Sequence, residues 1–350
     1  MIIGICYFTK QGEKVCNCIE QALAEDLIIK KQTKSTKEFV AYCLKRHVPL
    51  VFIGASGIAV RMIAPFVENK LEDSPVVVID ETSRYVIPIL SGHMGGANEL
   101  ASKLAQSLDA QAIITTATDI QKKFSVDLFA KNNHLYIENK DGIAKISSKI
   151  LNNETVTVCI SPEIDYTEKD LPKELSFVEY PPQKGVDILI AKPGTERFDC
   201  KLLLTTKEYV VGLGCKKGKA FEELKEFLYK QISHLETKQD KKIAMHQIYG
   251  ITSIDVKKKE QGILELCSFY HIPFYTYGAE KLKQIEGDFS QSDFVNKTVG
   301  VDNVCERAAS VLSDNGELLV RKQTEDGMTF ALAYKKPEIS TWKTEEIYEA

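Results

Sequence analysis

The 350-residue chain lacks an excess of positive charge, and it has no long apolar run. Its formal net charge is −4, whereas broad nucleic-acid binding usually needs a strongly basic face. No apolar stretch approaches the length that spans a membrane, and no basic stretch precedes the short apolar run at the start. We therefore expect a cytoplasmic protein without a secretory signal, and with neither a nucleic-acid nor a membrane partner.

The sequence also lacks the C-x-x-C spacing of zinc and redox sites, although it contains nine cysteines. The closest pair, Cys16 and Cys18, has only one residue between its members. Most cysteines stand within apolar patterns, for example Cys43, Cys267 and Cys305, where a free thiol packs as a small apolar group. We expect buried, reduced cysteines and no metal ion held by the protein.

Three common catalytic signatures are absent. The glycine turns match neither the P-loop, which needs a Lys-Ser/Thr pair, nor the G-x-G-x-x-G dinucleotide fingerprint. Ser56 and Ser91 lack the G-x-S-x-G elbow of serine hydrolases. A nucleotide-dependent enzyme is therefore a weak alternative, and we expect no cofactor.

What the sequence does contain is an alternation of strand and helix patterns, which favours an α/β fold with a mostly parallel sheet. Residues 1–150 predict an amino-terminal domain whose sheet has helices on both faces. Residues 151–205, where prolines cluster, indicate a small strand-rich middle module or a connector. Residues 206–335 repeat the order of strand, glycine turn and helix and predict a separate carboxy-terminal α/β domain, and residues 336–350 predict a polar tail.

Three polar loops follow apolar strand patterns in the amino-terminal domain, at residues 54–57, 91–96 and 115–119. Ligands collect outside the carboxyl ends of parallel strands, so we expect the three loops to share one edge of the sheet and to form one pocket. The apolar runs at 76–80 and 85–90 surround a polar turn and could instead pair as a hairpin, which would break this shared edge.

The first loop, GASG, resembles a phosphate-cradling turn, because glycine lets backbone N–H groups approach an anion at the start of a helix. Arg61, early in that helix, adds a forked donor that suits a carboxylate. A plain strand-to-helix turn explains the same spacing equally well. The candidate substrate-binding residues in this region are Gly54, Ser56, Gly57 and Arg61.

The second loop, SGHMGGAN, holds a histidine among small residues directly before a helix pattern. An imidazole in such a loop is reachable and titrates near neutral pH, so His93 is the first candidate for proton transfer. It could also merely satisfy a backbone carbonyl. Asp119 could orient the imidazole, and it could equally cap the next helix. The further candidates, of which Ser91 and Asn98 could serve only as helix caps, are Ser91, Gly95, Gly96, Asn98, Thr115 and Thr116.

The carboxy-terminal domain carries clusters of lysines, in GLGCKKGK and in SIDVKKKEQG. A charge run is usually a solvated face. The alternative is a site for a polyanionic ligand, and Lys257 is the candidate residue for it.

Taken together, these segments resemble the cobalt-precorrin-5A hydrolase family, often called CbiG. The amino-terminal block of that family is similar, in order and spacing, to IGASGIAVRMIAP, SPVVVIDE, ILSGHMGGANELASKLA and IITTATD. Its carboxy-terminal domain, which CobE-type proteins share, resembles VVGLGCKKGK, SIDVKKKEQGILEL, SDFVNKTVGVDNVCERAA and LLVRKQTEDGMTFALA. The resemblance covers most of residues 45–130 and 208–333.

The resemblance implies hydrolysis of the δ-lactone of a cobalt tetrapyrrole with several carboxylate arms, cobalt-precorrin-5A, and release of acetaldehyde, on the anaerobic route to cobalamin. Cobalt belongs to this substrate and not to the protein. For that reaction we assign proton transfer to His93, oriented by Asp119. Thr116 and the backbone N–H groups of Gly95 and Gly96 are the expected oxyanion donors. Arg61 and the GASG turn would hold a peripheral carboxylate.

A second hypothesis is a protein that binds or hands over the tetrapyrrole without reacting with it. It draws support from the CobE-type proteins, in which the carboxy-terminal domain occurs by itself. The sequence leaves the number of subunits open, and a homodimer is one arrangement that it allows.

Overall fold

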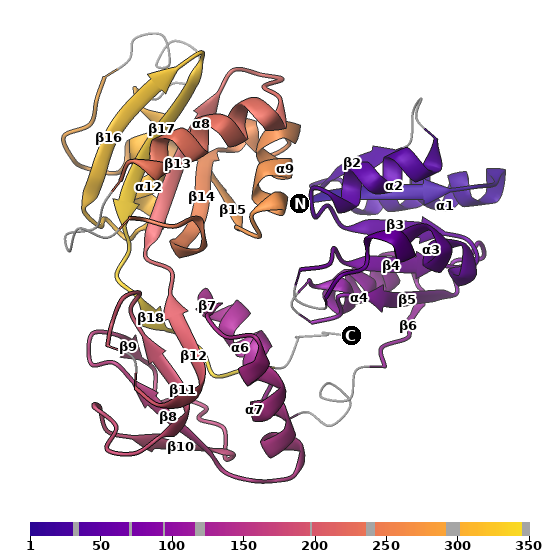
Figure 1. The fold of residues 1–350 in the computed structure, drawn as a ribbon. Coiled ribbons are helices and arrows are strands. Elements are labelled where there is room, and N and C mark those ends of the chain that lie inside the picture. The colour runs from indigo at the N-terminus through magenta and orange to yellow at the C-terminus, as the bar shows by residue number, and fades with distance from the viewer. Residues whose placement is uncertain are drawn as a thin grey trace. The chain divides into compact units, whose positions relative to one another are not determined.

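The computed structural model describes residues 1–30, 35–69, 72–93, 95–115, 123–196, 198–235, 242–291 and 302–344. These residues divide into two compact α/β units (Figure 1). Unit 1 is built from the described residues within 1–120, together with 259–271, and unit 2 from those within 121–258 and 272–344. The α/β fold class expected from the sequence is confirmed.

Unit 1 has a six-stranded sheet in the order β2-β1-β3-β4-β5-β6. The strands are β1 (Ile2–Tyr7), β2 (Leu27–Lys30), β3 (Leu50–Ile53), β4 (Val76–Ile79), β5 (Tyr85–Leu90) and β6 (Gln111–Ala112). Neighbouring strands are parallel except for β4 and β5, which are antiparallel. The mostly parallel sheet is therefore confirmed, and the two apolar runs on either side of residues 81–84 do pair as a hairpin.

Helices cover both faces of this sheet, as the sequence predicts. They are α1 (Lys10–Ala22), α2 (Thr36–Leu44), α3 (Ser56–Ile63), the 3-10 turn η1 (Ala64–Phe66), α4 (Ala97–Leu108) and α9 (Gln261–Phe269). Ile3 and Ile5 point to the face where Val15 of α1 and Leu104 of α4 complete a buried cluster. Gly4 lies between them and so faces the other side, where an added Cβ would stand 2.7 Å from the Sγ of Cys43 on α2.

Unit 2 contains two five-stranded sheets. The first has the order β10-β8-β11-β12-β7, and the antiparallel pairing of β7 with β12 closes one end of it. Its elements are α6 (Val126–Asn132), β7 (Leu135–Ile137), α7 (Asp141–Leu151), β8 (Val156–Ile160), β10 (Leu175–Val178), β11 (Val186–Ala191) and β12 (Cys200–Thr206). The strand-rich middle region is thus a folded sheet. Residues 126–150, which the sequence assigns to the amino-terminal domain, belong to unit 2 with this sheet.

The second sheet of unit 2 has the order β15-β14-β13-β17-β16. Its elements are β13 (Tyr209–Cys215), α8 (Phe221–Ser233), η2 (Met245–Gln247), β14 (Ile248–Ile254), η3 (Asp255–Lys257), β15 (Phe274–Tyr277), α10 (Ala279–Lys283), α12 (Val304–Leu312), β16 (Leu318–Glu325) and β17 (Met328–Tyr334). Strands β16 and β17 form a hairpin through Asp326 and Gly327, whose φ angles of 47° and 75° both lie in the left-handed region that a tight turn needs.

The sequence predicts a polar tail from residue 336 onward, whereas the structure shows that residues 338–342 pack into the fold. Strand β18 (Glu338–Ile339) pairs with β9 (Asp165–Tyr166), and Trp342 is only 2% exposed. The indole N–H donates to the carbonyl of Thr167 at 2.6 Å, and the ring stacks on Phe129. A two-residue strand and one aromatic anchor are too short to produce a periodic pattern, so the sequence reads as polar there.

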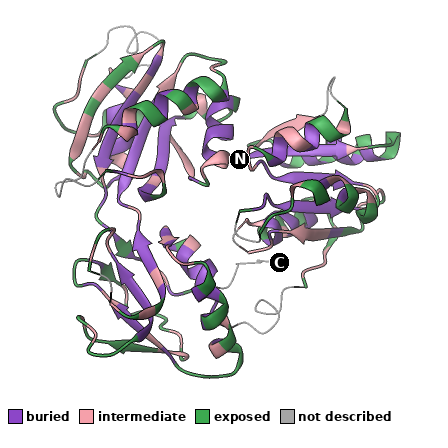
Figure 2. Cartoon of the chain, in the orientation of Figure 1, coloured by how far each residue is buried: buried purple, intermediate pink, exposed green. Residues whose placement is uncertain are grey.

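Burial agrees with the layer structure, because the central strands of each sheet are buried, whereas the edge strands β2, β10, β15 and β16 are intermediate or exposed (Figure 2). Cys43, Cys267 and Cys305 are buried and none of the nine cysteines forms a disulfide, which confirms their expected packing role. Within the described ranges, no helix is both long enough and apolar enough to cross a membrane.

Candidate functional site

Strand directions decide which of the predicted loops can meet. The register pairs Ile53 of β3 with Ile79 of β4, and Ile79 with Val86 near the start of β5. At the other end of the same strands, Leu50 pairs with Val76, and Val76 with Leu90. The loop of residues 54–57 therefore leaves the sheet at one edge, and the loop of residues 91–96 leaves it at the opposite edge.

The expectation that all three loops share one edge is therefore wrong, and the physical reason is the antiparallel β4–β5 hairpin. The two loops are separated by the length of about five strand residues, roughly 16 Å along the sheet. His93 and Arg61 belong to opposite edges, so they do not line one pocket of unit 1. The predicted single site is replaced by two separate regions.

The first region is the turn after β3. Gly54 has a φ of 145°, which lies in the left-handed region, and Ser56 and Gly57 begin α3. No side chain caps this helix, and the amide of Ile58 already donates to the carbonyl of Ala55 at 2.9 Å, which leaves the amides of Ser56 and Gly57 as the donors for a ligand. Ser56, Gly57 and Arg61 are exposed. Anion binding by this turn stays a prediction.

The second region is the loop of residues 91–96, and small residues build it. Ser91 has a φ of 55°, and its hydroxyl donates to the carbonyl of Asp73 at 2.5 Å. The amide of Ala97 donates to the Ser91 carbonyl, and the amide of Gly96 donates to the His93 carbonyl, each at 3.0 Å. A Cβ on Gly95 would stand 2.5 Å from the Cβ of Ser91. Only glycine therefore fits at position 95 without movement of the loop.

Two residues that the sequence predicts as substrate contacts, Ser91 in this loop and Asn98 at the start of α4, are buried, and their roles stay predictions. Ser91 is 7% exposed and Asn98 is 1% exposed. The Asn98 side chain fills the space beside Gly92, where an added Cβ would lie 2.9 Å from its Oδ1. Neither side chain caps α4, which begins after Gly96 without a side-chain cap. His93 is half-buried and stays the candidate for proton transfer.

The third predicted loop lies only partly within the described residues. Strand β6 runs parallel to β5, so residue 115 leaves the sheet at the same edge as the loop of residues 91–96, and Thr115 is exposed. Thr116 and Asp119 lie outside the described residues. Their assigned roles stay predictions.

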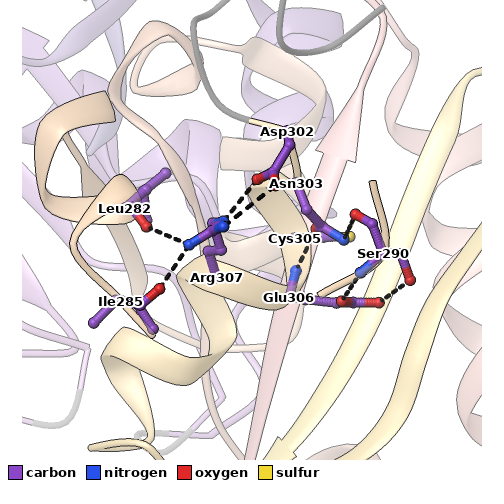
Figure 3. Close-up of polar contacts among 8 residues, drawn as sticks. All are labelled: Leu282, Ile285, Ser290, Asp302, Asn303, Cys305, Glu306 and Arg307. Atoms are coloured by element: carbon purple, nitrogen blue, oxygen red, sulfur yellow. Dashed lines mark hydrogen bonds and ion pairs between the residues drawn. The ribbon is translucent and has the colours of Figure 1, made fainter. Parts of the chain in front are cut away.

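Lys257, the candidate in the carboxy-terminal domain, ends the 3-10 turn η3 after β14 and belongs to unit 2. Helix α12 contacts the second sheet of unit 2, and a dense network of polar contacts surrounds its first residues (Figure 3). The buried carboxylate of Glu306 accepts from the amide and hydroxyl of Ser290 at 2.9 and 2.8 Å, and from the amide of Lys322 at 2.6 Å. Arg307 pairs with Asp302 at 2.8 Å. A buried carboxylate with three donors is a structural anchor, because its charge is fully solvated by the protein.

One pocket among the described residues of unit 2 contains none of the predicted site residues. Its lining includes His134, Lys207, Tyr249 and Lys335. Burial lowers the pKa of Lys207 to about 8 and, together with the positive charges of Lys207 and Lys335, lowers the pKa of His134 to about 4. These residues come from four separate stretches of the chain, so no sequence motif could reveal them.

The chain matches two family models. The model described as "Cobalamin synthesis G N-terminal" matches residues 38–119, and the model described as "Cobalamin synthesis G C-terminus" matches residues 209–333. Among curated proteins, the chain is 33% identical to "Cobalt-precorrin-5A hydrolase" of Salmonella typhimurium over 82% of each sequence. It is 31% identical to the protein of the same name from Priestia megaterium, over 81% of this chain and 78% of that one.

Among solved structures, the chain is similar to a protein described as a cobalamin biosynthesis protein G homologue from Sulfolobus solfataricus. The two share 22% identity, and the alignment covers 95% of this chain and 96% of that one, with a TM-score of 0.43.

Proposed function

Because the chain belongs to the cobalamin-synthesis G (CbiG) family, we propose that it is a hydrolase that opens the lactone of cobalt-precorrin-5A in cobalamin biosynthesis. The observation that carries the proposal is the presence of both family segments, residues 38–119 and 209–333, in one chain. The identity of 33% to a protein named for this activity extends over 82% of the chain and supports it further.

The reaction begins with the addition of water to the lactone carbonyl. The acyl–oxygen bond breaks, and the products are a carboxylate and a hydroxyl on the opened macrocycle. This step needs a group that takes a proton from water and donors for the oxyanion that develops on the carbonyl oxygen. Acetaldehyde then leaves by cleavage of a carbon–carbon bond, and the carbon that remains on the ring takes up a proton. Cobalt enters and leaves as part of the substrate.

His93 is the residue that we assign to proton transfer. Its loop is held by backbone hydrogen bonds and by close packing of Ser91 against Gly95, so the backbone that carries the imidazole is anchored at the sheet edge. The sequence assigns the backbone N–H groups of Gly95 and Gly96 as oxyanion donors. Because the amide of Gly96 donates to the His93 carbonyl at 3.0 Å, the amide of Gly95 is the donor that we propose from this loop. Asp119 and Thr116 complete the assignment as predictions from the sequence. A cytoplasmic location is a further prediction from the sequence, which allows a homodimer and leaves the number of subunits open.

The test is turnover by the purified full chain. We expect the chain, at one hundredth of the substrate concentration and without air, to convert all of the cobalt-precorrin-5A and to release one equivalent of acetaldehyde per substrate. A protein that only carries the tetrapyrrole would bind one equivalent and release no acetaldehyde. That outcome would replace the hydrolase by a carrier.

A further inference from the structure

The Lys207 side chain is a cation without a counter-ion in the part of the chain that the structure describes. Lys207 stands in the two-residue connection between β12 and β13 and is itself half-buried, between the buried residues Thr206 and Glu208. No ion pair or hydrogen bond involves its ammonium group among the described residues, and burial is the one cause of its lowered pKa. A buried ammonium group is costly unless an anion accompanies it.

The other charges of the pocket do not offset this cation. The ammonium of Lys335 pairs with Asp314, and that of Lys336 pairs with Asp165, so both are already neutralised. His134 is neutral at pH 7, because its pKa is about 4. Glu338 also lines the pocket, yet it does not affect the pKa of Lys207. Among the described lining residues, Lys207 is therefore the cation that no ion pair neutralises, and Glu338 is the carboxylate that shares the lining with it.

The walls of the pocket are fixed before any ligand arrives. Asn133 uses both ends of its amide. Its nitrogen donates to the carbonyls of Phe129 and Thr341 at 2.9 and 2.8 Å, and its oxygen accepts from the amides of Ser340 and Thr341 at 3.0 and 3.1 Å. On the opposite side, the amide of Lys335 donates to the carbonyl of Glu208 at 2.7 Å. A preformed site loses little conformational entropy when it binds a ligand.

The size of the pocket limits what can enter. It offers about 30 Å³ of space, whereas one water molecule needs about 10–15 Å³ on the same measure. Two or three heavy atoms therefore fit, and a ring does not. Besides the ammonium of Lys207, the lining offers the imidazole of His134, whose Nε2 lies 3.4 Å from the Tyr275 hydroxyl, and the hydroxyl of Tyr249 as polar partners.

We propose that this pocket of unit 2 binds a carboxylate group, with the ammonium of Lys207 as its counter-ion. This carboxylate belongs either to one of the acidic side chains of the tetrapyrrole or to a free small carboxylic acid. The first of these two assignments rests on the proposed function. Carboxylate binding requires the ammonium form. The other titratable groups that line the pocket are His134, Tyr249, Lys335, Lys336 and Glu338. Because the ammonium of Lys207 loses its proton above its pKa of about 8, the affinity falls as pH rises above that value.

The first experiment measures how fast an amine-specific reagent modifies Lys207 in the full chain, by mass spectrometry of peptides. Saturating propionate should slow the modification of Lys207 at least threefold relative to chloride at equal ionic strength. Lys145, an exposed lysine of the same unit that pairs with Asp141, should react at an unchanged rate. Equal rates for Lys207 in propionate and chloride would overturn the proposal, and so would phosphate that protects while propionate does not.

Two further ligands, tested in the same modification experiment, identify the source of the carboxylate. Protection by micromolar cobalt-precorrin-5A would assign the pocket to an arm of the macrocycle, whereas protection by propionate alone would assign it to a free acid. Both outcomes support carboxylate binding. Protection by cobalt-precorrin-5A without turnover would leave the site standing and reject the hydrolase, so the two proposals fail separately.

Variants provide the second readout. Propionate should raise the melting temperature of the wild-type chain, because a ligand of the folded state stabilises it. The rise should be absent in Lys207→Met, retained in Lys207→Arg and unchanged in the surface control Lys145→Met. An equal rise in Lys207→Met and in the wild type would overturn the role of Lys207, and the melting curve itself shows that each variant is folded.

Discussion

The loop of residues 91–96 and the pocket around Lys207 hold their polar groups in different ways. The loop is continuous in sequence, and its shape comes from backbone hydrogen bonds and from glycines that fit against Ser91 and Asn98. The pocket is discontinuous, and its shape comes from side chains such as Asn133 that join distant segments. The loop therefore depends on residue size, whereas the pocket depends on charge. Substitutions can test this difference directly.

The largest effect is expected for His93→Ala. Turnover of cobalt-precorrin-5A should fall about a hundredfold, because a positioned acid–base group commonly contributes that much or more. The melting temperature should stay within a few degrees of the wild type, since the imidazole is half-buried in a loop that the backbone holds. The matched control is His234→Ala, at the exposed end of α8, which should keep wild-type turnover. Full activity of His93→Ala would remove the loop from the mechanism.

The second largest effect is expected on stability, and urea unfolding of two glycine variants measures it. Gly95→Ala should lower the free energy of unfolding by about 1–3 kcal/mol, because the new Cβ collides with Ser91. Gly57→Ala meets no atom closer than the Arg61 Nη1 at 3.7 Å and lies in the first turn of α3, so it should be neutral or slightly stabilising. Equal stability of the two variants would show that the loop is not held by close packing.

A smaller effect is expected in the pocket, where Lys207→Met should raise the free energy of unfolding by about 1–2 kcal/mol at pH 7. The folded chain holds the ammonium at a pKa of about 8, below its ordinary value of 10.5. Below pH 8 the cost of the buried charge is fully present. As pH rises from 8 toward 10.5, the folded state loses the proton before the unfolded state does, so wild-type stability increases.

The advantage of Lys207→Met should therefore shrink above pH 8. Urea unfolding of the wild-type chain and of Lys207→Met between pH 6 and pH 10 measures this difference in the free energy of unfolding. A constant difference across that range would show that the ammonium is not desolvated in the folded chain.

The smallest effect is an expected absence of coupling between Arg61 and His93. Residues at opposite edges of the sheet share no contact, so the costs of Arg61→Ala and His93→Ala should add within about 0.5 kcal/mol. Steady-state kinetics of the two single variants and the double variant close the cycle. A larger interaction energy would mean that the two regions act on the substrate together in spite of their separation along the sheet.

Sequence patterns predicted the α/β layers and the burial of Cys43, Cys267 and Cys305, because each depends on local periodicity. They did not predict the edge at which His93 lies. That depends on the direction of β5, and an apolar run such as residues 85–90 carries no sign of its direction. Nor could they predict the Lys207 pocket, since contacts between residues 133, 207, 249 and 335 exist only after folding.

The central claim is that the chain uses water to open a lactone, and the most direct measurement is the reaction in water enriched in ¹⁸O. We predict that the tetrapyrrole product gains one ¹⁸O atom, in the carboxylate released from the lactone, and that none appears there when the chain is omitted. A product that forms without the label would mean that the ring opens by elimination and not by hydrolysis, and the account would be contradicted.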